Sequence, residues 1–260
     1  MSDAGKLAER LRNAYENGPV PPLRDGLDPQ DADLAYDVQA ANTQFWIQDG
    51  RKIVGRKVGL TAVAVQKQLG VDSPDFGVLF GDMEIPDGGT LWASKVIQPK
   101  AEAEVALIFG RDLNDAEATP ESIAQAVDYA SAAIEIVDSR IADWKITFAD
   151  TVADNGSSAF YVLGTDRRSI KGLDLYTCGM ALEVDGAVAS LGAGAACLGH
   201  PFNSAAWLVR TLAARGEGLR AGDVVLTGAL GPMVALSPGM KVRAQIGGLG
   251  AVHFDYSGAT

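Results

Sequence analysis

Apolar residues recur at helical spacing along the first part of the chain. The pattern predicts a first helix that begins after Ser2, a good N-cap residue, and ends at Gly18. A second helix is predicted over residues 28–50, because an Asp-Pro pair can start it and apolar positions then follow every three or four residues. A short third helix is predicted over residues 62–69. Residues 1–70 are therefore expected to form a helical N-terminal part.

The remaining residues, 71–260, mostly show the pattern of strands. Apolar runs of strand length occupy residues 103–109, 134–137, 180–184, 187–190, 223–227, 241–246 and 251–256. Between two of these runs, Asp185-Gly186 predicts a type I′ hairpin. Helices are predicted over residues 119–132 and 203–216. Strands with so few helices between them favour an antiparallel or mixed sheet over a doubly wound one.

Two glutamates, Glu102 and Glu104, alternate within an apolar run of strand character. Residues i and i+2 of a strand point to the same face, so their carboxylates would meet. Two half-buried carboxylates repel each other unless a positive group lies between them, and Mg²⁺ or Mn²⁺ favours such oxygen ligands. Glu135 is a natural third ligand, because Ile134 and Ile136 would otherwise bury a lone carboxylate. The alternative from this pattern alone is a solvent-exposed strand face, since E-x-E is a weak motif.

Composition narrows the possible functions. The chain has 260 residues, 47% of them hydrophobic, which suits one large domain or a small domain beside a larger one. Its net charge of −11 argues against binding to nucleic acid or to anionic membranes. An anionic substrate would need a local positive centre, which a bound metal would supply. The first residues lack the apolar core of a signal peptide and no stretch is apolar enough to span a bilayer, so a cytoplasmic protein is expected.

Several other polar residues have both a structural and a functional interpretation. Lys57 alternates with the apolar Val58, so an ammonium group directed inward competes with the usual surface position. Asp75 follows a proline turn, where aspartates usually bond their own backbone. Ser157 lies in a polar segment that is either an ordinary loop or part of a pocket. The two histidines lack partners at metal or triad spacing and the two cysteines form no CxxC motif, which weakens zinc, serine-hydrolase and redox interpretations.

Seven segments, in this order along nearly the whole chain, resemble one known family. They are residues 54–61 (VGRKVGLT), 68–77 (QLGVDSPDFG), the E-x-E run, 139–144 (SRIADW), 150–155 (DTVADN), 197–201 (CLGHP) and 226–234 (LTGALGPMV). Together they resemble the 2-keto-4-pentenoate hydratase family, within the fumarylacetoacetate hydrolase superfamily. The family commonly reads Asp-Asn-Ala-Ser followed shortly by Gly, whereas this chain has Gly156 at the Ala and Ala159 at the later Gly. This departure leaves the preferred length of the substrate tail open.

The resemblance implies an α+β fold, with a mixed β-roll catalytic core over residues 71–260 and the helical part at residues 1–70. It implies Mg²⁺ or Mn²⁺ held by Glu102, Glu104 and Glu135. It also implies a symmetric homo-oligomer, a pentamer or a decamer, and a possible association with a decarboxylase or aldolase of the same pathway.

The substrate of the family is 2-hydroxypenta-2,4-dienoate from aromatic-ring degradation, whose C1 carboxylate and C2 oxygen chelate a hard cation. The cation would ease tautomerisation, water would add at C4, and the product would be 4-hydroxy-2-oxopentanoate. The proton transfers need acid–base groups of near-neutral pKa. Lys57, with a pKa lowered by the cation, and Asp75 are expected to approach the substrate from opposite sides of the metal. Ser157 matches the serine of the family and is expected to contact the substrate.

Three other functions stay open at this point. A 4-oxalocrotonate decarboxylase, from the same superfamily, would use the same chelate as an electron sink while a C–C bond breaks. An acylpyruvate hydrolase is weaker, because the sequence shows no Glu–His pair for its base. A non-catalytic subunit that supports a decarboxylase is disfavoured by the intact E-x-E motif and Glu135. Turnover by the isolated chain would separate an enzyme from such a subunit.

Overall fold

The computed structural model describes residues 2–63, 66–67 and 71–258. Helix α1 (Asp3–Asn17) begins as predicted, because the Ser2 hydroxyl accepts a hydrogen bond from the backbone N–H of Gly5. Helix α2 (Ala32–Gln48) begins later than predicted. Its N-cap is Asp31, while the Asp28 carboxylate accepts from Gln30 within a turn. Val63, Gln66 and Lys67 are helical, and the rest of the predicted helix over residues 62–69 lies largely outside the described residues.

The larger sheet runs in the order β2-β1-β10-β5-β6-β7-β3, with β11 paired to β5. Its strands are β1 (Ile53–Gly59), β2 (Asp75–Phe80), β3 (Glu84–Ile85), β5 (Pro99–Phe109), β6 (Val127–Asp138), β7 (Ser158–Leu163), β10 (Val224–Ala229) and β11 (Val234–Ala235). β1 pairs parallel to β10 and β3 parallel to β7, while the other pairs are antiparallel. The expected mixed sheet is confirmed. Because β1 belongs to this sheet, the first 70 residues contribute a strand to the core as well as helices.

The smaller sheet has five strands in the order β4-β13-β12-β8-β9. They are β4 (Thr90–Trp92), β8 (Gly179–Val184), β9 (Ala187–Ala193), β12 (Lys241–Ile246) and β13 (Gly250–Ser257). The turn between β8 and β9 has φ of 52° at Asp185 and 81° at Gly186, which confirms the predicted type I′ hairpin.

Two of the later helices differ from the prediction. Helix α4 (Pro120–Ala126) ends six residues early, because β6 begins at Val127 and pairs along β5. Helix α6 (Pro201–Ala214) is capped by His200, whose Nδ1 accepts from the N–H of Phe202. Asn203, where the helix was predicted to begin, instead donates a hydrogen bond from its side-chain amide to the Leu198 carbonyl. His200 therefore has a structural role at the start of this helix.

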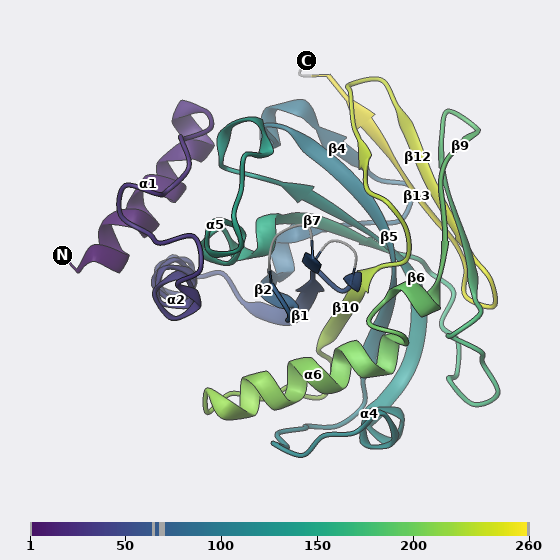
Figure 1. Ribbon diagram of the computed structural model, residues 1–260. Helices are drawn as coiled ribbons and strands as arrows, with labels where there is room; N and C mark the ends of the chain where they lie inside the picture. Colours follow the sequence, from purple (N-terminus) through teal and green to yellow (C-terminus); the bar gives the residue numbers. More distant parts are fainter. Residues whose placement is uncertain (1, 64–65, 68–70, 259–260) are drawn as a thin grey trace.

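The two sheets and the helices are arranged in layers. The curled larger sheet occupies the middle, the smaller sheet covers one side, and α1 and α2 lie on the other (Figure 1). Helix α5 (Phe148–Ala153) packs against α2, and α6 packs against α4 and β10. A buried apolar core runs through both sheets, with Val105, Ile134 and Phe254 fully buried. Among the described residues, the helices are too short or too polar to cross a membrane.

Candidate metal centre and active site

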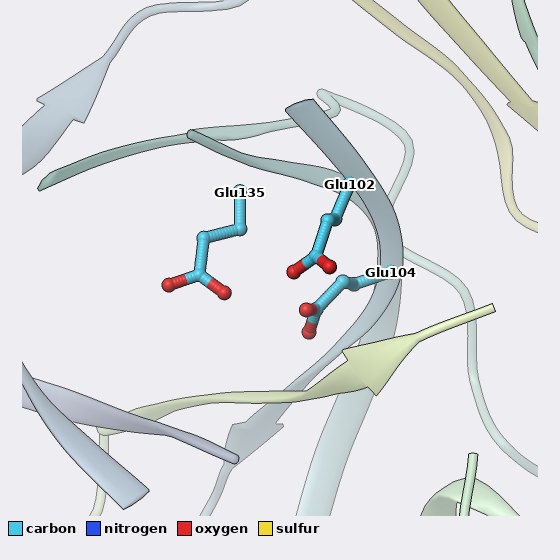
Figure 2. Close-up of side chains that lie close together, drawn as sticks. All are labelled: Glu102, Glu104 and Glu135. Atoms are coloured by element: carbon cyan, nitrogen blue, oxygen red, sulfur yellow. The ribbon is translucent and has the colours of Figure 1, made fainter. Parts of the chain in front are cut away.

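Three carboxylates meet at the middle of the larger sheet. Glu102 on β5 lies directly opposite Glu135 on β6, and Glu104 follows two residues later on the same face. One carboxylate oxygen of each lies within 4.8 Å of the others. Figure 2 shows the three side chains converging from the two neighbouring strands. The structure thus brings together the three glutamates that the sequence singled out.

The burial of this cluster leaves oxygen atoms without partners. Glu104 and Glu135 are fully buried, whereas Glu102 is partly exposed. One oxygen of Glu104 accepts a 2.7 Å hydrogen bond from the backbone N–H of Gly228. The other oxygen of Glu104 and both oxygens of Glu135 accept no hydrogen bond from the described residues. Converging, buried carboxylate oxygens that accept no hydrogen bond are the donor set that a hard divalent cation prefers.

Burial raises the pKa of two of the three carboxylates. Burial, with Glu135 and Asp75 adding to it and Lys57 opposing it, raises the pKa of Glu102 to about 7. Burial and the charges of Glu135 and Glu102 raise the pKa of Glu104 well above its ordinary value. The protonated forms of Glu102 and Glu104 are thereby favoured, and a cation bound to them would replace the protons.

Lys57 reaches the cluster from β1. Its Nζ donates a 2.9 Å hydrogen bond to the carbonyl oxygen of Gly156 and lies 3.2 Å from a carboxylate oxygen of Glu135. The inward orientation that competed with a surface position is therefore the observed one. Burial acts to lower the pKa of Lys57, but the surrounding carboxylates outweigh it and raise the pKa. The net effect of the protein is thus opposite to the expected lowering, which a cation on those carboxylates would favour.

Asp75 lies beside Lys57 and not across from it. In the pairing of β1 with β2, Lys57 faces Gly77 and Gly59 faces Asp75, which puts both charged side chains on one face. A Cβ atom at Gly59 would lie 2.2 Å from Asp75 Oδ1 and 3.2 Å from Lys57 Nζ. The expected approach from opposite sides is therefore wrong. Burial raises the pKa of Asp75, with Lys57 opposing it.

Ser157 belongs to a tight turn that faces Lys57. Asn155, Gly156 and Ser157 have φ of 59°, 61° and 54°, a left-handed run that costs about 1–2 kcal/mol for each residue other than glycine. The Ser157 hydroxyl is buried and lies 3.4 Å from the Thr151 hydroxyl. A Cβ atom at Gly156 would lie 3.1 Å from Lys57 Cδ, so the glycine at this position enlarges the space beside the lysine.

A cavity of about 630 Å³ lies behind this turn, on the side of α1 and α2. Its lining includes Arg140, Asp154, Asn155 and Ala159, and it does not include the three glutamates. Ala159, the second departure from the family pattern, therefore lines this outer cavity.

Sequence reasoning assigned no role to Arg140 or Asp154. The two residues form a buried ion pair with Nε of Arg140 2.5 Å from Asp154 Oδ1. The available signal was an arginine three residues after the end of an apolar strand run, where a buried charge requires a partner. Cys178 and Cys197 are free and buried. The Nδ1 atom of His253 lies 3.0 Å from Asp87 Oδ1.

Comparison with known proteins agrees with this architecture. The chain is 52% identical to a 2-keto-4-pentenoate hydratase of Paraburkholderia xenovorans (strain LB400), over 96% of this chain and 94% of the relative. It is 37% identical to a 2-hydroxyhexa-2,4-dienoate hydratase of Comamonas testosteroni, over 97% and 95% of the two chains. A fumarylpyruvate hydrolase from Pseudomonas aeruginosa, 19% identical with a TM-score of 0.63 over 80% of this chain and 90% of the other, shares the fold.

A second solved structure is much more similar. The 4-oxalocrotonate decarboxylase from Pseudomonas putida G7, complexed with magnesium and adipate, is 36% identical with a TM-score of 0.93, and the match covers 97% of each chain. The family model described as fumarylacetoacetate (FAA) hydrolase C-terminal matches residues 52–255, which hold the carboxylate cluster, Lys57 and Asp75. The chain therefore belongs to the fumarylacetoacetate hydrolase family.

Proposed function

We propose that this protein is a divalent-metal-dependent hydratase that adds water to 2-hydroxypenta-2,4-dienoate and forms 4-hydroxy-2-oxopentanoate. The observation that carries the proposal is the buried cluster of Glu102, Glu104 and Glu135 beside Lys57. It occurs in a chain that is 52% identical to relatives named 2-keto-4-pentenoate hydratase. Such a cluster suits a substrate that presents a carboxylate and an adjacent oxygen to a cation.

The three glutamates would hold the cation, Mg²⁺ or Mn²⁺, through oxygen atoms that have few other partners. When bound, the cation supplies Lewis-acid stabilisation of negative charge on the C2 oxygen of the substrate. The net charge of −11 makes such a local positive centre necessary for an anionic substrate.

Lys57 and Asp75 are the acid–base groups of the proposal. The dienol must lose the proton of its C2 hydroxyl and gain one at C5 to become the 2-oxo-3-enoate. Hydration then places the hydroxyl group of water at C4 and a proton at C3. Lys57 is held by Gly156 and Glu135, so its ammonium group is positioned beside the carboxylates that would hold the cation. Asp75, whose pKa is raised, can take a proton from water and return it to carbon. Ser157 would donate a hydrogen bond to the substrate from the turn above Lys57.

Decarboxylation of 4-oxalocrotonate is the second candidate, favoured by the 97% coverage and TM-score of 0.93 to the decarboxylase of Pseudomonas putida G7. The same chelate would then accept electrons from a breaking C–C bond. A non-catalytic subunit of such a decarboxylase is the third. We further propose a symmetric homo-oligomer, a pentamer or decamer, which can associate with a decarboxylase or aldolase of the same pathway.

One experiment separates these functions. The purified chain is supplied with freshly generated 2-hydroxypenta-2,4-dienoate, or with 4-oxalocrotonate, in the presence of Mg²⁺ or Mn²⁺, and the products are identified. Formation of 4-hydroxy-2-oxopentanoate supports the hydratase. Release of CO₂ from 4-oxalocrotonate without hydration would replace it by the decarboxylase, and no turnover of either compound would indicate the supporting subunit.

A further inference from the structure

We infer that Arg140 is a positioning residue, which fixes the turn of residues 155–157 against Lys57 and so sets the geometry of proton transfer. The inference rests on the proposed function of the carboxylate site. Arg140 lies two residues after the end of β6 (Val127–Asp138) and is 2% exposed. Among the described residues it bonds to none of the three glutamates. Its influence on the site must therefore pass through the turn.

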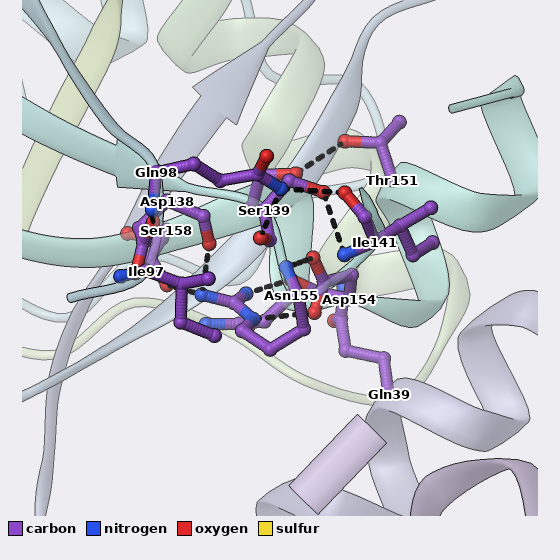
Figure 3. Close-up of polar contacts among 12 residues, drawn as sticks. Gln39, Ile97, Gln98, Asp138, Ser139, Ile141, Thr151, Asp154, Asn155 and Ser158 are labelled. Carbon is purple, nitrogen blue, oxygen red and sulfur yellow. Dashed lines mark hydrogen bonds and ion pairs between the residues drawn. The ribbon is translucent and has the colours of Figure 1, made fainter. Parts of the chain in front are cut away.

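One guanidinium group holds both ends of that turn. At the entry, the Arg140 backbone N–H and Nε donate to the two carboxylate oxygens of Asp154, and a terminal nitrogen donates to the Asp154 carbonyl. At the exit, the other terminal nitrogen donates to the Ser158 carbonyl at 3.2 Å and also to the Asp138 carbonyl. Asp154, Ser158 and Asp138 gather around this point in Figure 3. The planar fork of an arginine suits several acceptors at fixed angles, which a lysine cannot match.

The turn needs this support because its own conformation is unfavourable. Its three residues all have φ between 54° and 61°, and only Gly156 adopts such a value without steric cost. Its first residue, Asn155, lines the cavity of about 630 Å³, so close packing does not hold the turn at that residue on the cavity side. On its inner side the Gly156 carbonyl accepts the 2.9 Å hydrogen bond from Lys57. A shift of the turn would move the lysine and Ser157 together.

The test is Arg140→Lys, which keeps the positive charge beside Asp154 but loses the fork. We expect kcat for the dienoate to fall on the order of 10- to 100-fold, as for a small misplacement of reacting groups. The dissociation constant for Mn²⁺ should stay within about threefold, because the glutamates are not touched. Asp150→Asn is the matched control. Asp150 is also buried and completes the capping box at the start of α5, where it accepts from the backbone N–H groups of Thr147 and Leu23. Its loss should lower thermal stability but leave kcat unchanged.

A double-mutant cycle distinguishes positioning from general destabilisation. If Arg140 acts through the turn, Arg140→Lys should cost much less in kcat/KM when Ser157 is already alanine. Fully additive effects, or a wild-type kcat in folded Arg140→Lys, would overturn the inference. If Arg140→Lys does not fold, Asp154→Asn takes its place with the same expectations, and failure of both to fold would assign the pair a structural role only. The products formed by the wild type test the proposed function separately. If the wild type proves to be a decarboxylase, the same variants are assayed by their release of CO₂.

Discussion

Lys57 Nζ lies 3.2 Å from a carboxylate oxygen of Glu135, and Glu135 stands directly opposite Glu102 in the pairing of β5 with β6. The lysine and the proposed cation therefore share one carboxylate. A cation on that carboxylate would act to lower the pKa of Lys57, as the proposed acid–base role requires. The first two predictions test the metal-binding carboxylates and the acid–base groups in turn.

Glu102→Gln, Glu104→Gln and Glu135→Gln should each greatly weaken binding of Mg²⁺ or Mn²⁺ and abolish most activity, because an amide oxygen carries no charge to offset the cation. The shape of the side chain is kept, so circular dichroism should show an intact fold. Isothermal titration with Mn²⁺ measures the affinity. Glu117→Gln, at an exposed position, is the control that should bind like the wild type. Full activity of the wild type after exhaustive chelation would contradict the role of the metal.

Lys57→Met and Asp75→Asn should keep metal affinity and lose kcat by roughly 10²-fold or more, as expected for acid–base groups. Steady-state kinetics with the dienoate measure the loss, and metal titration verifies that the cluster is intact. Lys52→Met is the control, because Lys52 lies exposed before the same strand. Near wild-type kcat in either site variant would remove that residue from the proposed mechanism.

Ser157→Ala should reduce kcat/KM by an amount worth about 1–3 kcal/mol, the usual cost of losing one buried hydrogen bond to a ligand. The neighbouring Ser158 offers a matched comparison, since its buried hydroxyl has no hydrogen-bond partner among the described residues. Ser158→Ala should therefore have kinetics close to those of the wild type. Unchanged kcat and KM in Ser157→Ala would show that Ser157 serves only the turn.

Metal affinity should rise with pH through neutrality. The pKa of Glu102 is raised to about 7, so below this value a proton competes with the cation for the carboxylate. The apparent affinity for Mn²⁺ should increase between about pH 6 and 8 and level off above, with proton release on binding. Titrations in buffers of different ionisation enthalpy measure that release. A pH-independent affinity without proton release would contradict the raised pKa.

Gly77→Ala should destabilise the fold and lower activity, because its Cβ would lie 2.3 Å from the Asn155 carbonyl oxygen and 3.2 Å from Lys57 Cδ. The overpacking should cost about 1–3 kcal/mol of unfolding free energy, measured by denaturant titration. Gly179→Ala is the control, since a Cβ there meets no atom within 4 Å. Equal stability of the two variants would contradict the prediction, because it would mean that the Asn155 turn moves away from the added Cβ at little cost.

The sequence predicts what depends on local periodicity and misses what depends on pairing. Alternation alone places Glu102 and Glu104 on one face, and the structure agrees. The position of Glu135 opposite Glu102 depends on the register of β5 with β6, which no local pattern encodes. The same limit explains Lys57 and Asp75, which become neighbours only through the pairing of β1 with β2.

The predicted end of the helix over residues 119–132 was wrong for a related reason. Residues 127–132 can continue a helix by their own preferences, but pairing with β5 makes them a strand. The Arg140–Asp154 pair spans 14 residues and forms inside the protein, so its role in the turn followed only from the structure.

The Asn155 side chain also covers part of the edge of the larger sheet, along strand β2. Strand β2 is the outermost strand in the sheet order, and the Asn155 side chain accepts from the N–H of Val78 and donates to its carbonyl, as an adjoining strand would. Sheet edges left open, in runs as apolar as Phe76–Phe80, recruit strands from other molecules. Displacement of the Asn155 turn would thus expose the edge of β2 to pairing with other chains. A substitution that impairs catalysis by displacing this turn should therefore also cause aggregation.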